Sequence, residues 1–502
     1  MAGSSREPAD KLRRLSAASF PAPLPDASET GSVGAGCVRQ GPRTVKELTC
    51  YAERLLQDQQ RFALGSESLA TRMMGNLRQV GFRTAFSGVD APIHALHALA
   101  TALQLPPSCI RYLSACDVWQ PSQKALRSLP PDWRPRSIEG NILDCLSPSV
   151  RLEFERTHAE YAAAAVVKGS VQQQMLRSHV KKSVQLLEPH DLRPPGEPLD
   201  GSDLNFGLQL QVVGLDCSDF SPRGSRKKTA GESLKGMLVY LVRVHQMKPH
   251  AIIVEEAVDF MHEGMALLSL VLGDLYTVEG EWICPSSFGW PISRRRSWIV
   301  LRSRQECICH QPWTSSALDC WTRACVLTGD DLFVAPPESV PPHMKRMSIS
   351  EKQKFQTQQR SLAELPHEKR KTIFNLKQNY PYGQPSVLLP SFTRTTTKLW
   401  SRTHSRCMTA DEQLFSMGIP TKHLASKCCE RGEHAALLEL PISLFSEPEK
   451  AALAGGTMHT QVMCAVLIHV VRSTEVRPRR DKAWQVCRDG GAWSRGNSTL
   501  FH

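Results

Sequence analysis

The sequence lacks any continuous run of about 18 apolar residues, although 41% of its 502 residues are hydrophobic. A bilayer-spanning helix needs about 20 mostly apolar residues, so no transmembrane helix and no membrane partner are expected. The N-terminal residues also lack an apolar core segment and include acids such as Glu7 and Asp10, which argues against a secretory signal. Without such a signal, the 16 cysteines are interpreted as reduced thiols of an intracellular protein.

Internal repeats and paired Cys-x-x-Cys ligands are absent as well. The first absence excludes repeat architectures, and the second removes the strongest sequence signal for zinc. Cys307, Cys309 and His310, with Cys320 and Cys325 further along, offer enough ligands for zinc, but their spacing follows no established pattern. Ordinary reduced thiols are favoured there, and no metal is expected.

The chain carries 61 Lys and Arg against 49 Asp and Glu, a formal net charge of +12. Such a charge suits a polyanionic partner such as nucleic acid, although basic tails alone would also produce it. Residues 1–75 are predicted to form a disordered, basic segment, because residues 1–45 are rich in Ser, Pro, Gly and Arg. Residues 476–502 are predicted to form a second basic tail.

Between these tails, short apolar runs alternate with helical patterns, which favours an α/β fold with a largely parallel sheet flanked by helices. Residues 303–400 contain more Pro, Gln, Lys and Thr and few periodic runs, so we interpret them as a second, smaller domain or a large insertion. Strands are predicted at 83–86, 112–115, 210–216, 251–255, 277–283 and 298–301, and helices at 93–99 and 150–187.

A first candidate ligand site is the loop 86–92, where the first predicted strand turns into a helix. Gly88 in such a turn lets backbone amides approach a ligand at the helix N-terminus. Asp117 ends the next predicted strand, about 30 residues on, where an acid can bind ribose hydroxyls. An ordinary tight turn and a surface Asp would produce the same pattern, so both interpretations remain open.

Cys217 lies where the predicted strand 210–216 gives way to a loop rich in Ser, Gly and Arg. A thiol at the carboxyl edge of a sheet is placed like a nucleophile, and the arginines of the loop would favour its thiolate. Asp216 and Asp219 act in the opposite direction. Glu255 ends the next strand at the same edge, so a thiol and a carboxyl form a candidate reaction centre. A buried core cysteine is the alternative.

Arg294 and Arg296 belong to a run of three arginines that opens the strand predicted at 298–301. A solvated charge run is one interpretation. The functional interpretation is a guanidinium directed at a base carbonyl or a phosphate.

Taken in order, these segments resemble the motifs of the DNA (cytosine-5) methyltransferases over residues 80–475. The segment 216–221 (Asp-Cys-Ser-Asp-Phe-Ser) resembles the nucleophile motif Pro-Cys-Gln-x-Phe-Ser, and 255–257 (Glu-Glu-Ala) resembles Glu-Asn-Val. The order and spacing carry the resemblance more than any single motif. The other matches are 292–296 to Gln-Arg-Arg-x-Arg, 86–92 to the first cofactor motif, Asp117 to the ribose-binding acid, 140–142 (Gly-Asn-Ile) to Gly-Asp-Ile, 408–420 to the ninth motif and 454–459 to the tenth.

The resemblance implies a Rossmann-like S-adenosylmethionine-dependent methyltransferase fold, with a mostly parallel seven-stranded sheet and a smaller target-recognition domain. The catalytic domain would cover 76–302 and 401–475, and the target-recognition domain 303–400. The implied catalytic residues are Cys217, Glu255, Arg294 and Arg296. The residues implied to bind S-adenosylmethionine are Phe86, Ser87, Gly88, Val89, Asp90, Asp117, Asn141, Ile142 and Thr457.

In the implied reaction, Cys217 attacks carbon 6 of a cytosine flipped out of double-stranded DNA. Glu255, protonated, would hydrogen-bond nitrogen 3 of the ring, while Arg296, with Arg294 behind it, holds the base carbonyl. A nuclear location and a monomeric state are expected from this substrate. The basic residues expected to contact phosphates are Arg302, Arg304, Lys345, Arg346, Lys369, Arg370 and Lys371.

Four positions depart from the family pattern: Asp216 for Pro, Ser218 for Gln, Glu256 for Asn and Gly456 for Asn. They leave two alternatives open. One is a tRNA cytosine-5 methyltransferase of the same fold, although Ser221, where that group has Thr, favours DNA. The other is a catalytically silent paralogue that binds nucleic acid or a partner enzyme.

Overall fold

The structure is a computed structural model that describes residues 39–62, 67–165, 170–194, 207–215, 219–220, 227–363, 371–378, 385–394, 398–421 and 438–477. Contacts divide the chain into residues 1–39 and residues 40–502, and the helices and strands named below belong to the second unit.

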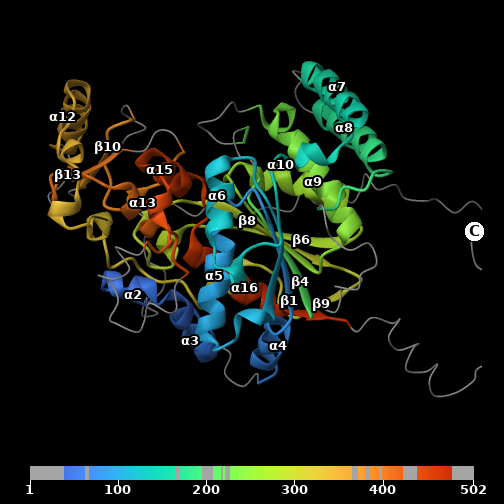
Figure 1. The fold of residues 1–502 in the computed structure, drawn as a ribbon, viewed down its shortest axis with the longest axis horizontal. Helices are drawn as coiled ribbons and strands as arrows, with labels where there is room; N and C mark the ends of the chain where they lie inside the picture. The colour runs from blue at the N-terminus through green and yellow to red at the C-terminus, as the bar shows by residue number, and fades with distance from the viewer. Residues whose placement is uncertain are drawn as a thin grey trace, which may run out of the picture. The chain divides into compact units, whose positions relative to one another are not determined.

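A seven-stranded sheet lies at the centre of this unit, with strand order β3-β2-β1-β4-β5-β8-β6 (Figure 1). The first five strands of that order run parallel, whereas β8 is antiparallel to both β5 and β6. The predicted α/β fold with a mostly parallel, Rossmann-like seven-stranded sheet is therefore confirmed. The strands are β1 (Val80–Ala85), β2 (Ile110–Cys116), β3 (Ser137–Glu139), β4 (Leu208–Val213), β5 (Ala251–Glu256), β6 (Tyr276–Ile283) and β8 (Arg296–Ser303).

The apolar residues of the central strands alternate between the two faces of the sheet. In β5, Ala251 and Ile253 belong to one hydrophobic cluster, whereas Ile252 and Val254 belong to the other. Successive strand residues point to opposite faces, so an unbroken apolar run can serve only a strand that is covered on both sides. This is why the short apolar runs of the sequence become central strands.

Helices cover both faces of the sheet and form two layers (Figure 1). One layer contains α3 (Tyr51–Phe62), α4 (Glu67–Leu77), α5 (Ala91–Ala102) and α16 (Thr460–Ser473), and α16 contacts the other three. The other contains α7 (Pro148–Ala164), α8 (Ser170–Leu187), α9 (Ser233–Met247) and α10 (Phe260–Leu272). The shorter α6 (Gln120–Ser128) links β2 to β3, and α13 (Ala410–Ser416) and α15 (Glu447–Gly456) precede α16.

Two sequence-based boundaries differ from the structure. The single helix predicted at 150–187 is two helices, α7 and α8, which pack on each other. The disordered segment predicted at 1–75 is wrong for its second part, because 45–62 and 67–75 are helical in α2 (Val45–Thr49), α3 and α4. Leu48, Tyr51 and Leu55 of these helices lie in the core.

Residues 303–400 serve two parts of the fold. Trp313 and Trp321 are buried in the main core, and β9 (Cys307–Cys309) pairs with β14 (Thr474–Val476). A separate small cluster holds Phe374, Leu376, Trp400 and Cys407. It is built on α12 (Ile349–Ala363) and the sheet β10 (Ile373–Asn375), β12 (Leu399–Ser401) and β13 (Arg406–Cys407). The strand β11 (Leu389–Pro390) returns the chain to β7 (Ile292–Ser293), with which it pairs in parallel.

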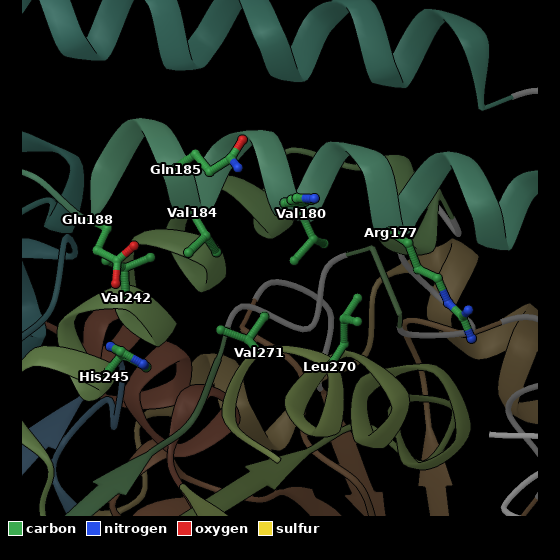
Figure 2. A pocket seen from close by; sticks show the side chains of 10 residues that line it. Arg177, Val180, Val184, Gln185, Glu188, Val242, His245, Leu270 and Val271 are labelled. Carbon is green, nitrogen blue, oxygen red and sulfur yellow. The ribbon is translucent and has the colours of Figure 1, made fainter. Parts of the chain in front are cut away.

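A groove of about 370 Å³ lies between α8, α9 and α10. In Figure 2, Val180 and Val184 of α8 face Leu270 and Val271 of α10 across it. It contains none of the predicted site residues, so it lies apart from the predicted chemistry.

The stretch Glu447–Ser473, which holds α15 and α16, has the length and mean hydropathy of a membrane-crossing helix, and 78% of its apolar window is buried inside the protein.

Candidate active site

The predicted site segments meet at one edge of the sheet. Because β3, β2, β1, β4 and β5 run parallel, their carboxyl ends share that edge, and residues 141, 117, 86–90 and 255 come at or just after four of these ends. The connections from β1 and β4 diverge there, since β1 leads to β2 on one side and β4 to β5 on the other. Doubly wound sheets bind their ligands in the crevice at such a switch point.

The loop after β1 has an unusual backbone. Phe86, Gly88 and Asp90 have φ angles of 55°, 67° and 67°, all in the left-handed region that side chains disfavour. A Cβ on Gly88 would lie 2.7 Å from the carbonyl oxygen of Gly456 and 3.3 Å from the amide nitrogen of Thr457. Only glycine permits both the φ angle and this approach. The first and the last predicted cofactor segments are therefore in direct contact.

Asp117 holds this loop from the end of β2. Its carboxylate accepts hydrogen bonds from the amides of Gly88, at 3.2 Å, and Trp119, at 2.8 Å. The side chain is only 4% exposed, so the surface-Asp alternative is wrong. Burial raises the pKa of Asp117, against the opposing effects of the Trp119 amide and the Arg394 guanidinium.

Asp90 is fully buried behind the loop and faces away from solvent. Its carboxylate accepts hydrogen bonds from the hydroxyl of Ser87, at 2.9 Å, and from the hydroxyl of Tyr112. Burial raises the pKa of Asp90 to about 7, although these hydrogen bonds lower it. Asp90 therefore holds the loop from its buried side, while the backbone of the loop at Gly88 faces the segment 456–457.

Asn141 and Ile142 follow β3 at the same edge. The side-chain oxygen of Asn141 accepts a hydrogen bond from the Leu143 amide, at 3.0 Å, and caps the 3-10 helix η3 (Ile142–Cys145). Ile142 is 2% exposed and packs in the core. Val89 is equally buried, so both apolar side chains pack in the interior beneath the crevice.

Glu255 and Arg296 form an ion pair at the end of β5, with 3.3 Å between a carboxylate oxygen and Nε of Arg296. The antiparallel pairing of β5 with β8 brings them together, because it sets Glu255 opposite Trp298, two residues after Arg296. Both side chains are largely buried, which strengthens their attraction. Of the predicted catalytic residues, these two are in direct contact.

Arg294 has a different position from Arg296. Its guanidinium is buried and donates to the backbone carbonyls of Phe392, at 3.2 Å, and Thr457, at 3.0 Å. It therefore fastens the last predicted cofactor segment to the start of β8. The hydroxyl of Thr457 is buried and has no hydrogen-bond partner among the described residues.

Cys217, Asp216 and Ser218 lie outside the described residues. The strand that leads to them, β4, ends at Val213 between β1 and β5. Beyond them, Asp219 is 4% exposed and accepts hydrogen bonds from the amide of Ser233, at 2.9 Å, and its hydroxyl, at 2.7 Å. A Cβ on Gly231 would lie 1.9 Å from Cγ of Asp219, so only glycine leaves room for this contact.

Two of the predicted phosphate contacts do not face the site. Arg302 is 1% exposed and pairs with Glu279, at 2.6 Å. In the pairing of β5 with β8, Arg302 lies opposite Ala251, which is at the other end of β5 from Glu255. Arg304 follows at that end, where it donates to the carbonyls of Gly273 and Tyr276. Lys345 and Arg346 are exposed on the smaller part of the fold, and Lys369 and Arg370 lie outside the described residues.

The alternative zinc ligands do not converge. The thiol of Cys307 contacts the carbonyl of His250, whereas His310 pairs with Glu475 at 2.6 Å. Cys325 contacts the carbonyls of Ser286 and Trp290 instead. Across the part of the chain that the structure describes, no three His, Cys, Asp or Glu side chains are grouped to hold a metal.

Comparison with known proteins gives matches among solved structures only; no protein-family model and no curated protein matches the sequence. The Dnmt2 methyltransferase of S. pombe shares 14% identity and a TM-score of 0.41, over 78% of this chain and 97% of that one. The methyltransferase EhMeth of Entamoeba histolytica has 11% sequence identity and a TM-score of 0.43, over 78% of this chain and 98% of that one. A DNMT2 mutant of Spodoptera frugiperda has 14% sequence identity and a TM-score of 0.39, over 78% of this chain and 99% of that one. The Rossmann-like fold of this chain is established by its own strand order.

Sequence reasoning missed three residues that complete the crevice. Tyr112 holds Asp90, Trp119 donates its amide to Asp117, and Arg394 lies over the Trp119 ring at 5.8 Å. Trp119 had a local signal, since it follows the strand-end acid by two residues. Arg394 had none, because it lies more than 270 residues from Trp119 in an aperiodic segment.

Proposed function

We propose that this protein is an S-adenosylmethionine-dependent DNA (cytosine-5) methyltransferase. The observation that carries the proposal is the Glu255–Arg296 ion pair at the carboxyl edge of the sheet. The pair lies at the end of β5, and β5 is next to β4, the strand that precedes Cys217 in sequence. On its other side β4 is next to β1, which leads into the cofactor loop. The proposal therefore assigns the thiol of Cys217, the carboxyl of Glu255 and the guanidinium of Arg296 to one crevice between neighbouring strands.

The residues of the crevice fit S-adenosylmethionine. Gly88 gives the loop a close approach to the segment 456–457, and Asp117 lies where a ribose would bind. Val118, which is 60% exposed, offers an apolar surface beside Asp117. The buried Thr457 hydroxyl needs a hydrogen-bond partner, which a bound ligand would provide. When bound, S-adenosylmethionine supplies an electrophilic methyl group.

The protein groups would act on the base. Carbon 5 of cytosine is a weak nucleophile, and addition of the Cys217 thiolate to carbon 6 makes it electron-rich. Glu255 would hydrogen-bond nitrogen 3 of the ring as a protonated acid, while Arg296 releases Glu255 to hold the base carbonyl. Once carbon 5 carries its methyl group, loss of the carbon-5 proton re-forms the double bond and expels Cys217. A base in a duplex reaches this crevice only when it is flipped out.

Glu256, one of the departures from the family pattern, is used locally. Its carboxylate accepts a hydrogen bond from the Ala257 amide, at 2.7 Å, and the side chain is 1% exposed. It orders the turn after β5 and stays in the interior. This supports an active enzyme over a silent paralogue, because the turn that positions Glu255 is retained.

The smaller part of the fold, around α12 and β10 to β13, is the proposed DNA-recognition region. Lys345, Arg346 and Lys371 lie on it and are the remaining described candidates for phosphate contacts. A nuclear location and a monomeric state complete the proposal, both inferred from the substrate.

The test is covalent trapping on duplex DNA that contains 5-fluorocytosine, with labelled S-adenosylmethionine. Fluorine cannot leave as a proton does, so the enzyme stays attached to the base. We expect a denaturation-resistant adduct with the wild type and none with Cys217→Ala. Glu255→Gln should reduce the rate of adduct formation about 100-fold or more. Cys309→Ala, which removes an exposed thiol at the opposite edge of the sheet, should trap as the wild type does.

Three outcomes would contradict the proposal. Absence of an adduct, where a control methyltransferase forms one, would favour the silent paralogue. An adduct with fluorinated tRNA in place of DNA would assign the enzyme to RNA. Methylation by Cys217→Ala at the wild-type rate would exclude Cys217 as the nucleophile.

A further inference from the structure

Arg394 fills the space beside Gly456. A Cβ on Gly456 would lie 2.8 Å from Nε of Arg394, and one on Gly455 would lie 2.6 Å from its amide nitrogen and 2.4 Å from the carbonyl carbon of Thr393. Side chains do not tolerate such distances to backbone. Glycine at both positions therefore lets the segment 391–394 lie directly against the turn that ends α15.

The other side of the Arg394 guanidinium faces the start of α6. It lies 5.8 Å from the centre of the Trp119 ring, and its charge opposes the raised pKa that burial gives Asp117. α15 and α6 are in contact, and Arg394 lies beside both Gly456 at the end of α15 and Trp119 at the start of α6. The residue is exposed, so its guanidinium is accessible to a ligand.

The crevice segments themselves carry no other cation. Residues 86–90, 117–119, 140–142 and 455–459 contain no Lys or Arg, and burial lowers the pKa of His459 to about 3, so it stays neutral. The same segments contain two acids, Asp90 and Asp117. Arg294 and Arg296 come from another segment, but Arg294 donates to the carbonyls of Phe392 and Thr457 and Arg296 pairs with Glu255, so an anionic group of a ligand needs a further cation here.

We infer that Arg394 binds the carboxylate at the amino-acid end of the cofactor. The inference rests on the proposed function, because it concerns the same crevice. S-adenosylmethionine has one carboxylate, and a guanidinium matches a carboxylate with two parallel hydrogen bonds. If the ribose binds at Asp117, a carboxylate that reaches Gly456 and Thr457 past the loop at Gly88 would come beside Arg394, which lies next to Gly456.

Two ligands that differ at that end give a direct test. S-adenosylhomocysteine carries the carboxylate, whereas 5′-methylthioadenosine keeps the adenine, ribose and sulfur but has no carboxylate. Binding of each to the purified full-length protein is measured by isothermal titration calorimetry for the wild type, Arg394→Ala and Arg394→Lys. Arg156→Ala is the matched control, because it removes another exposed arginine, on α7. Thermal melting checks that each variant is folded.

We expect Arg394→Ala to weaken S-adenosylhomocysteine about 10- to 100-fold while the affinity for 5′-methylthioadenosine changes less than about twofold. Arg394→Lys should recover part of the loss, and Arg156→Ala should bind both ligands normally. Equal losses for both ligands would show that Arg394 only supports Trp119 and the end of α15, and would overturn the inference. Unchanged binding of both ligands would also overturn it. A wild type that binds neither ligand would refute the cofactor assignment, and with it the inference.

Discussion

Asp90 provides a stability test that depends on pH. It is fully buried, and its carboxyl accepts hydrogen bonds from the hydroxyls of Ser87 and Tyr112. Burial raises its pKa from 3.8 to about 7. Because the folded protein holds this proton at pH values where the unfolded chain has lost it, the contribution of Asp90 to stability decreases as pH rises from about 4 to about 7.

The size of this effect follows from the pKa. Raising a carboxyl pKa from 3.8 to about 7 corresponds to about 4 kcal/mol of lost stability above pH 7. Asn at position 90 has nearly the same shape, tolerates the left-handed φ of 67° and cannot ionise. Asp90→Asn should therefore be more stable than the wild type by about 2–4 kcal/mol at pH 8, and by only about 1–1.5 kcal/mol at pH 5.

Guanidinium unfolding followed by tryptophan fluorescence measures the difference at both pH values. The control is Asp132→Asn, an exposed carboxyl whose removal should change the unfolding free energy by less than about 0.5 kcal/mol at either pH. A variant less stable than the wild type at pH 8 would refute the reasoning. So would a stabilisation that is the same at pH 5 and pH 8, because desolvation of the charge would then not be its source.

Two further predictions concern the support of the site. Gly231→Ala places a Cβ 1.9 Å from Cγ of Asp219. It should lower the unfolding free energy by about 1–3 kcal/mol and slow adduct formation on 5-fluorocytosine DNA. Gly75→Ala is the control, because open space surrounds that position, and it should have neither effect. Arg302→Ala should cost about 3–5 kcal/mol, because it leaves Glu279 without its buried partner. In an anisotropy titration, Arg302→Ala should leave the slope of log affinity for DNA against log salt concentration unchanged, whereas Lys345→Ala should reduce that slope. A reduced slope for Arg302→Ala would show that Arg302 does contact DNA phosphates.

The sheet could be predicted from sequence because its signal is local. In β5 and β8 each apolar residue serves one face, and covering both faces makes the whole strand apolar. The helices before β1 have a local signal too, since the buried residues Tyr51, Leu55 and Gln59 of α3 recur at helical spacing, but their place in the fold does not follow from it. α3 is mostly polar, and its anchors come from distant residues: Trp321 donates to the carbonyl of Leu55, and Arg323 pairs with Asp58. No local pattern contains such partners.

The site was predictable to the level of the sheet edge and no further. Parallel strands necessarily bring their carboxyl ends together, so the sequence order of strand-end residues indicates which of them share an edge. The partner of each side chain depends on register and on distant loops. Arg294 and Arg296 look equivalent in sequence, yet Arg294 binds the backbone of Phe392 and Thr457, while Arg296 pairs with Glu255.

The acids around Cys217 can now be separated by what they contact. In sequence, Asp216 and Asp219 argue against a thiolate, because a nearby carboxylate disfavours it. Asp219 is committed to the amide and hydroxyl of Ser233, at the start of α9, and Glu256 to the amide of Ala257. Hydrogen bonds from these donors hold both carboxylates on protein groups. The objection to an active thiol therefore rests mainly on Asp216, which replaces a residue that cannot carry charge.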